Sequence, residues 1–150
     1  MKKYLSAFVL CCFSFVAHAS DGVVKVESAQ GVTATADKLE KVLTSKGMTI
    51  MARVPHSQSA AGVGIELRET ELLIFGNPKA GSPLMKCEQM IALDLPQKAL
   101  VYADEAGKTW IAYNDPMYLK ARHKVEGCDD ALAKISGALG KLTAAAAMAN

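Results

Sequence analysis

A glycine-bearing turn in the middle of the chain is the segment whose residue types best suit ligand binding. Residues 71–75 form an apolar run of strand length, and Gly76-Asn77-Pro78 ends it. Ser82-Pro83 then predicts a helix start, with Ser82 as the cap and proline at the first helical position. Free N–H groups at a helix start, together with Lys79, can hold an anion or a small molecule. A sharp turn without a ligand is the alternative, because glycine supplies unusual backbone angles.

Six residues are the predicted ligand-binding set of this region. The turn contributes four of them, and two polar residues at the end of a later strand join them, because ligand sites concentrate at such ends. The set is Asn77, Lys79, Gly81, Ser82, Tyr113 and Asn114. The turn lacks the Gly-Lys-Ser/Thr ending of a nucleotide-binding P-loop, which excludes that class of protein.

His56 and Glu66 are the residues that could do acid–base chemistry. His56 follows a predicted strand on a polar stretch, where an imidazole can act as base, ligand or hydrogen-bond donor near neutral pH. Glu66 is the acid that could orient it. If the ends of the sheet converged, this pair would share one pocket with Asn77 and Tyr113. A capping or surface role for His56 is the alternative.

The other histidine outside the N-terminal segment and the methionines have structural explanations. His123 ends a basic helix, where a cation favours the helix dipole. Thioether ligands suit copper, but the spacing of the methionines is scattered and matches core positions. These are Met48, Met51, Met85, Met90 and Met117. We therefore predict neither a metal site nor a cofactor.

The first 19 residues have the layout of a cleavable secretory signal peptide. Lys2-Lys3 precedes an apolar run over residues 4–16, and Ala17-His18-Ala19 gives a small-x-small cleavage site. The run has about a dozen residues, whereas a helix that spans a bilayer needs roughly 20. Cleavage would leave a periplasmic or secreted chain that begins at Ser20 and has no membrane attachment.

Removal of the signal peptide leaves a domain of zero formal charge. The whole chain has 17 lysines and arginines against 15 acids, and the predicted cleavage removes Lys2 and Lys3 but no acid. A neutral domain lacks the basic footprint that a phosphate backbone requires. Nucleic acid is therefore excluded as a partner.

Cys87 and Cys128 are the two cysteines that remain after cleavage. In an oxidising compartment such a pair is expected to form a structural disulfide. Closing this loop would stabilise the fold by roughly 4 kcal/mol on the chain-entropy estimate. A reactive thiol or a soft-metal site is the alternative, although the chain has no Cys-x-x-Cys motif.

Apolar patterning predicts a single domain over residues 20–150. Strands are predicted over 23–27, 48–54 and 71–75, and a hairpin over 98–103 and 109–113. Helices are predicted from a Thr33 cap to Lys46, over 59–63, from Ser82 to Ile91, over 115–123 and over 129–150. This order predicts an α+β fold, a mostly antiparallel sheet with helices packed on one face.

The predicted C-terminal helix is amphipathic. Its apolar face consists of Leu132, Ile135, Leu139 and Leu142. This face could cover the sheet or be presented to a partner.

Three motifs follow one another along the chain. They are Gly76-Asn77-Pro78-Lys79-Ala80-Gly81-Ser82-Pro83-Leu84-Met85, Ala92-Leu93-Asp94-Leu95-Pro96 and Trp110-Ile111-Ala112-Tyr113-Asn114-Asp115-Pro116. Together with Leu39-Glu40, Lys46-Gly47-Met48, His56 and residues 60–68, they resemble the domain of unknown function 302 family over residues 23–124. The resemblance implies a fold similar to the TATA-binding-protein-like class and a homodimer, and it implies no activity.

The chain departs from this family pattern at three positions. It has Pro55 before the histidine where the family has Asp, Glu69 after the Leu-Arg pair where the family has Pro, and Ser82 where the family has Thr. Serine keeps the capping hydroxyl. Without the neighbouring acid, His56 would need a partner from elsewhere, such as Glu66.

Our leading functional hypothesis is a noncatalytic module that binds a small molecule or an anion near residues 76–85. One alternative is an enzyme that uses His56 and Glu66 as an acid–base pair. The other is an interaction protein that uses the C-terminal helix.

Overall fold

The computed structural model describes residues 22–149. The predicted signal peptide, residues 1–19, lies outside the described residues and stays a prediction.

The centre of the molecule is an antiparallel sheet of five strands in the order β1-β5-β4-β3-β2. The strands are β1 (Val23–Ser28), β2 (Thr49–Pro55), β3 (Thr70–Gly76), β4 (Gln97–Ala103) and β5 (Thr109–Asn114). Every neighbouring pair is antiparallel. The apolar alternation of the sequence sets the two faces, because successive side chains of a strand point to opposite sides.

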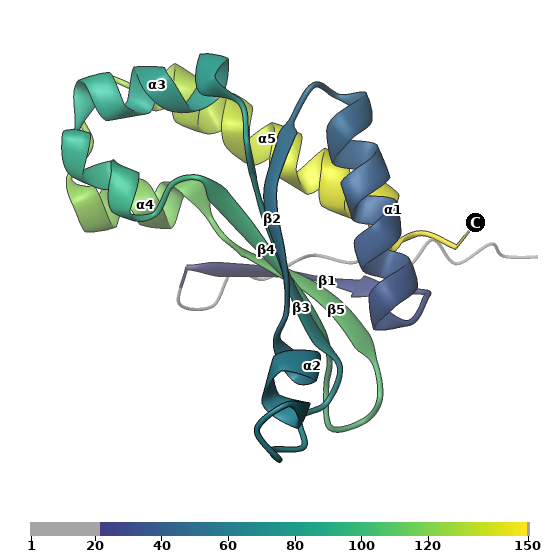
Figure 1. Ribbon diagram of the computed structural model, residues 1–150. Coiled ribbons are helices and arrows are strands. Elements are labelled where there is room, and N and C mark those ends of the chain that lie inside the picture. Colours follow the sequence, from purple (N-terminus) through teal and green to yellow (C-terminus); the bar gives the residue numbers. More distant parts are fainter. Residues whose placement is uncertain (1–21, 150) are drawn as a thin grey trace, which may run out of the picture.

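Helices cover one face of the sheet and one of its ends (Figure 1). They are α1 (Val32–Ser45), α2 (His56–Ala61), α3 (Pro78–Cys87), the 3-10 helix η1 (Gln89–Leu93), α4 (Pro116–His123) and α5 (Asp129–Ala147). Helices α1 and α5 pack on the sheet, while α3, η1 and α4 gather beside α5, and α2 lies at the opposite end. The predicted α+β fold is confirmed.

The main core lies between the sheet and the helix pair α1 and α5. Leu39 from α1, Phe75 from β3 and Val101 from β4 are 0–1% exposed there. The apolar residues of α5 that face the sheet, Leu139 and Leu142, belong to the same core. The apolar face of the C-terminal helix therefore covers its own sheet and is not free for a partner.

A second, smaller core joins α3, η1 and α4 to the first half of α5. Its buried members are Leu84, Ile91, Leu119, Val125 and Leu132. This cluster attaches the layer of short helices to one end of the sheet.

Several helix ends differ from the predictions. Helix α3 begins at Pro78 rather than at Ser82, because Asn77 is the cap and Pro83 lies inside the helix. Helix α1 has Gly31 as its N-cap without a side-chain bond, since the hydroxyl of Thr33 donates to Glu71 instead. Helix α2 begins at His56 rather than at residue 59, and α5 ends at Ala147 rather than at residue 150.

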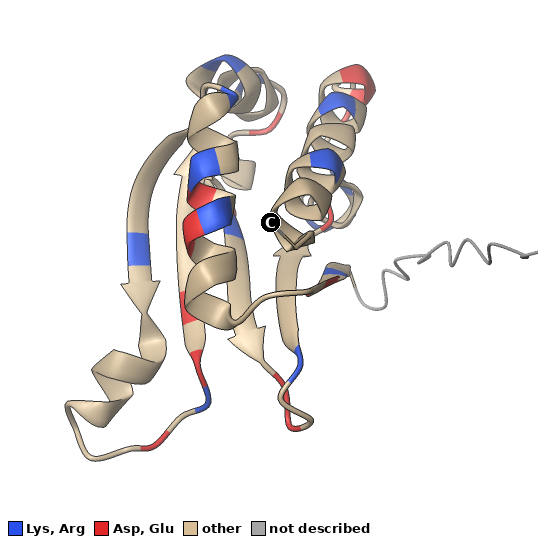
Figure 2. Cartoon of the chain, turned by 90° about the vertical axis from the view of Figure 1, so that its right-hand side faces the viewer, with Lys and Arg blue, Asp and Glu red and all other residues tan. Residues whose placement is uncertain are grey.

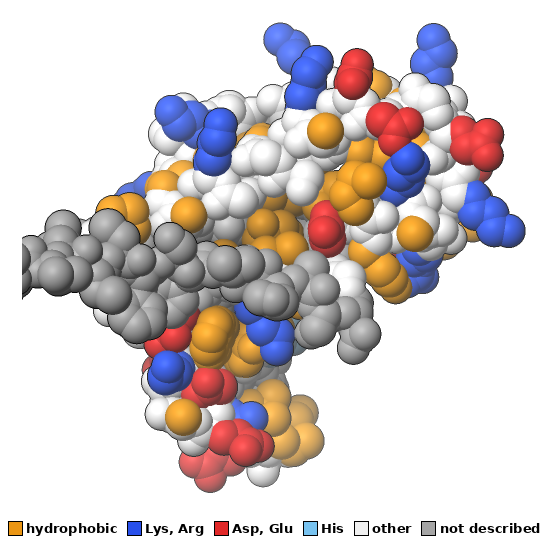
Figure 3. Space-filling model, turned by 180° about the vertical axis from the view of Figure 1, so that it is seen from behind, with side chains coloured by type: hydrophobic (Ala, Val, Ile, Leu, Met, Phe, Trp, Pro, Cys, Tyr) orange, Lys and Arg blue, Asp and Glu red, His pale blue; other side chains and the backbone are white. Residues whose placement is uncertain are grey.

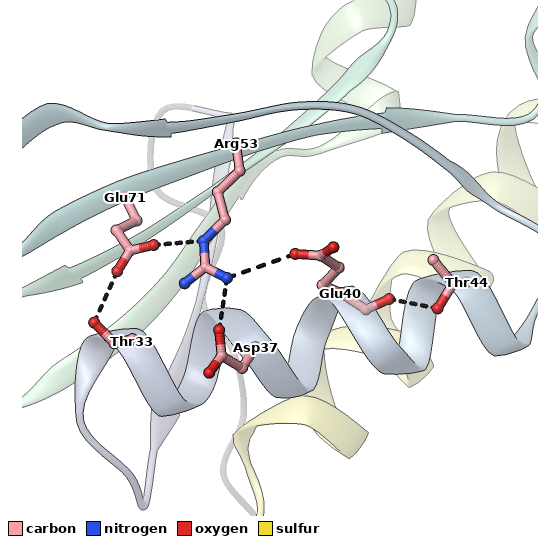
Figure 4. A network of polar contacts seen from close by, with 6 residues as sticks. All are labelled: Thr33, Asp37, Glu40, Thr44, Arg53 and Glu71. Carbon is pink, nitrogen blue, oxygen red and sulfur yellow. Dashed lines mark hydrogen bonds and ion pairs between the residues drawn. The ribbon is translucent and has the colours of Figure 1, made fainter.

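A β-bulge in β2 turns Arg53 toward the helices. The register shifts between Ile50 and Ala52, so Arg53 lies opposite Leu73 on the helix-covered face. There its Nε lies 2.6 Å from Glu71 and its Nη1 lies 2.6 Å from Asp37 (Figure 4). Arg53 thus ties β2 to both β3 and α1.

The contacts around Arg53 satisfy the carboxylate of Glu71, which is almost fully buried. The side chain of Glu71 is 9% exposed and also accepts a 2.9 Å hydrogen bond from the hydroxyl of Thr33. The hydrogen bond with Glu71 is the largest cause of the raised pKa of Arg53. A buried acid of this kind needs both partners, because a charge without a partner is costly in the interior.

Other charges lie at the periphery. Figure 2 shows lysines, arginines and acids on the helix α1 and at the loops, with few on the strands. From behind, hydrophobic side chains gather in the middle of the upper part, with charged ones around its margin (Figure 3). This face of the molecule therefore has an exposed apolar area with a charged margin.

We expect Arg53→Met to lower the free energy of unfolding by about 3 kcal/mol, because it leaves the Glu71 carboxylate buried without its cation. Lys108→Met is the matched control, because it removes only the exposed pair with Glu27 and should cost less than about 1 kcal/mol. Urea unfolding at neutral pH measures both values. Equal losses in the two variants would contradict the role given to Arg53.

Candidate functional site

A cavity of about 340 Å³ opens at the end of the sheet where β3 leads into α3. Its walls come from the end of β3, from α3, from the connector between η1 and β4, and from the middle of α5. Apolar lining residues include Met48, Met51, Phe75, Met85, Leu95 and Ile135. The volume is within the range of small-molecule sites in proteins.

The predicted turn forms the rim of this cavity. Asn77, Gly81 and Ser82 line it, and Lys79 lies in an adjoining hollow. A Cβ atom at Gly81 would have Leu95 as its neighbour, at 3.9 Å. The absence of a side chain at Gly81 therefore leaves more space at this wall of the cavity. The four turn residues therefore line two neighbouring spaces, and their role in binding stays a prediction.

The backbone donors at the start of α3 are already bonded within the chain. Pro78 has no N–H, that of Lys79 donates to the Asn77 side chain, and those of Ala80 and Gly81 donate to the Asn77 carbonyl. The Asn77 amide also donates to the carbonyl of Gly47, at 2.9 Å. Asn77 therefore fixes the rim to the loop before β2, and the turn offers a ligand the cavity behind it rather than free N–H groups.

Gln97 supplies a buried polar group to the otherwise apolar cavity. The residue is 9% exposed, lines the cavity and pairs with Phe75 across the strands β3 and β4. Its Nε2 is the buried side-chain nitrogen that has no hydrogen-bond partner within residues 22–149. An unpaired buried donor costs about 1 to 3 kcal/mol, so this amide calls for an acceptor.

Sequence reasoning did not single out Gln97, although a signal existed. Gln97, Ala99 and Val101 alternate along β4, and the latter two are core residues. A polar residue on the same strand face as buried apolar residues is itself expected to be buried, and its side chain then requires a hydrogen-bond partner.

The methionines were predicted as core residues, and this was wrong for most of them. Met51, Met85, Met90 and Met117 are 37–58% exposed. Three of the five, Met48 included, line the cavity. Flexible thioether side chains suit a wall that must adapt to an occupant.

Tyr113 and Asn114 do not join the cavity. Tyr113 is 6% exposed in the main core, and burial raises the pKa of its phenol. Its oxygen lies beside Gly140 of α5, 3.9 Å from where a side chain there would begin. Asn114 is exposed at the last position of β5. The structure thus gives Tyr113 a packing role and places Asn114 at the surface.

His56 and Glu66 lie at the other end of the sheet. His56 follows the last residue of β2 and Glu66 precedes β3, whereas Asn77 follows the far end of β3. Both side chains are exposed, and neither has a side-chain hydrogen bond within the described range. A strand of this length spans roughly 20 Å, so the pocket shared with Asn77 and Tyr113 does not form. The acid–base alternative gains no support from this arrangement.

His123 has a partner that the helix-dipole explanation missed. Its side chain is 6% exposed, and Nε2 lies 2.5 Å from Asp94, to which Arg122 also pairs at 3.3 Å. Asp94 begins the connector that carries Leu95 and Pro96 into the cavity wall. The cluster therefore holds the connector against α4.

Cys87 and Cys128 are joined by a disulfide with a Cα–Cα distance of 6.5 Å, so the predicted pairing is confirmed. Cys87 is the last residue of α3 and Cys128 is the cap of α5. The bond therefore links two of the walls of the cavity.

Two kinds of feature are absent from residues 22–149. No group of His, Cys, Asp and Glu side chains there is arranged to hold a metal ion. No helix in that range has the length and apolar content needed to cross a bilayer.

The fold and the site together define an α+β domain with a small apolar cavity at one sheet end. The family model named "Domain of unknown function DUF302" matches residues 24–142, and the chain belongs to this family. A solved structure, "Crystal structure of uncharacterized conserved protein DUF302 from Bacillus stearothermophilus", has a TM-score of 0.73 at 20% identity. The match covers 85% of this chain and 97% of that one, and it shows the shared fold.

Curated relatives carry a different name. "Fluoride-specific ion channel FluC 1" of Brucella suis biovar 1 is 42% identical over 104 residues, which is 69% of this chain and 41% of that protein. "Fluoride-specific ion channel FluC 2" of Brucella melitensis biotype 1 is 42% identical over the same length, with 38% of that protein covered. The chain thus spans about two fifths of these relatives.

We expect the Cys87→Ser, Cys128→Ser double variant to lose about 4 kcal/mol of unfolding free energy, because the unfolded chain is no longer cross-linked. Urea unfolding with and without reductant measures this. Reductant should lower the stability of the wild type to that of the variant and leave the variant unchanged. Alkylation of both sulfurs in the folded wild type without reductant would contradict the bond.

Proposed function

We propose that this domain is a noncatalytic binding module for a small, largely apolar molecule that carries one hydrogen-bond acceptor. The observation that carries the proposal is a largely apolar cavity of about 340 Å³ whose lining includes Gln97, a buried residue whose Nε2 has no hydrogen-bond partner within residues 22–149. Apolar lining with a few convergent polar groups is typical of small-molecule sites. In this proposal the apolar walls provide the affinity for the ligand, and the Gln97 amide determines the orientation of the ligand.

A neutral acceptor fits this interior better than a charged group. Among the residues that line the cavity, Gln97 is the buried one with an unpaired amide nitrogen, and the N–H groups of the nearby helix start are already bonded to Asn77. A carboxylate in such a place would lose its hydration and regain one hydrogen bond, which is unfavourable. A carbonyl or ether oxygen needs only one donor.

We expect the wild type to bind 2-octanone and Gln97→Leu to bind it about tenfold more weakly, the loss of one hydrogen bond from a buried donor. Ligand-observed saturation-transfer NMR measures the affinity. The same substitution should raise the unfolding free energy of the empty protein by about 1 kcal/mol, because an unpaired buried amide is replaced by an apolar group.

Gln89→Leu is the matched control, because Gln89 is exposed and does not line the cavity. Ala138→Phe on α5 and Ala92→Leu on the opposite wall should each exclude the ketone by filling the cavity. Undiminished binding in both filled variants, or none in the wild type, would refute the proposal. Equal binding by Gln97→Leu and the wild type would remove the role of the amide.

We also propose, as a second candidate, that the domain acts together with a fluoride channel. The relatives that share 42% identity over 104 residues are named fluoride-specific ion channels, and the matched stretch is a minor part of each. Two modules joined in one chain meet at high effective concentration, which favours a shared process. The cavity would let the domain respond to a molecule other than fluoride.

We expect deletion of the gene from its native host to lower the fluoride concentration that stops growth, because the partner channel loses its accessory domain. Growth curves in fluoride measure this, and the wild-type gene should restore tolerance. Ala138→Phe in the restored strain reports whether the cavity is needed. Unchanged fluoride tolerance after deletion would contradict this candidate and leave the cavity proposal standing.

Export and self-association stay predictions. The Cys87–Cys128 bond supports an oxidising compartment. The sheet face opposite α1 and α5 carries Leu100, Tyr102 and Trp110, which are half-buried and support a homodimer. Mass spectrometry of the exported protein tests cleavage, and we expect Ser20 as its first residue. The molar mass of the protein in solution tests the homodimer.

A further inference from the structure

We propose that the ligand is an aliphatic carboxylic acid, with its neutral acceptor inside the cavity and its carboxylate at the mouth beside Lys134 and Lys79. The inference rests on the proposed function and names the chemical class of its ligand. It follows from a second hollow that shares five lining residues with the cavity.

The two spaces share part of their lining. The second hollow is lined by Lys79, Pro83, Asp130 and Ala131, which the cavity does not touch. The residues common to both spaces are Met48, Asn77, Ala80, Lys134 and Ile135. Lys134 therefore lies where the apolar part meets the polar part.

The mouth carries an excess of positive charge. Lys79 from α3 and Lys134 from α5 are both exposed, and neither forms an ion pair within residues 22–149. Asp130 is the acid at this mouth, so two cations oppose one anion. Lysine stems can lie along the apolar rim while their ammonium groups reach water.

The two ends of the site demand opposite chemistry, which fixes the orientation of the ligand. The cavity is lined mainly by apolar side chains and includes Gln97, whose buried Nε2 is unpaired within the described residues. The mouth has solvent and lysines, where a carboxylate keeps part of its hydration. An acid with a carbonyl near its far end meets both demands, whereas a fully apolar molecule matches only the apolar walls.

The test compares two probes that differ only at one end. 7-Oxooctanoate has the ketone and chain of 2-octanone, with the terminal methyl group replaced by a carboxylate. We expect the wild type to bind the keto acid up to about fivefold more tightly than the ketone, the upper end of the range for an exposed charge pair. The Lys79→Met, Lys134→Met double variant should bind the two probes equally, and added salt should reduce the preference of the wild type.

Asp130→Asn is the opposite control, because it removes the acid from the mouth and should increase the preference for the keto acid. Circular dichroism checks that each variant is folded. Binding of 2-octanone without a preference for 7-oxooctanoate, or a preference that survives loss of both lysines, would overturn the inference and leave the proposed function intact. Failure of both probes to bind would overturn both.

Discussion

The disulfide between Cys87 and Cys128 is the constraint on which the cavity depends. It holds the end of α3 to the start of α5, and these helices form two of the cavity walls. The small core of Leu84, Ile91 and Leu132 acts between the same elements. A void in a protein loses packing contacts and tends to collapse unless its walls are fixed. The covalent link therefore allows a cavity to persist where a few short helices meet a sheet end.

The other end of the molecule is stabilised in a different way, and the difference indicates which end could bind a ligand. There the charges of Arg53 and Glu71 are paired and hydrogen-bonded between β2, β3 and α1. Such a satisfied network rigidifies the frame and leaves no group for a ligand. At the cavity end, Gln97 keeps an unused donor and Lys134 keeps an unpaired charge within the described residues. Polar groups without partners, rather than paired ones, mark where a ligand can add a contact.

The sequence predicted the framework well and the site only in part. Apolar alternation, apolar runs and a hairpin loop predicted the five strands, and cysteine count predicted the bridge, because burial and pairing act on residue type directly. The predicted start of α3 was wrong, because the sequence offers two cap-and-proline pairs, Asn77-Pro78 and Ser82-Pro83. The first pair is the one used, and the Asn77 side chain is held there by its hydrogen bond to the carbonyl of Gly47. His123 and Gln97 were missed for the same reason: their partners, or lack of them, depend on contacts between distant segments.

The empty protein keeps two unfavourable features in one place. Gln97 has an unpaired buried nitrogen, and the apolar cavity beside it lacks packing atoms. Each lowers the stability of the unoccupied fold, and one occupant with an acceptor would remove both. A ligand that binds only the folded chain stabilises it by mass action. An apolar residue at position 97 would favour stability alone, so the amide at that position supports the proposed binding role.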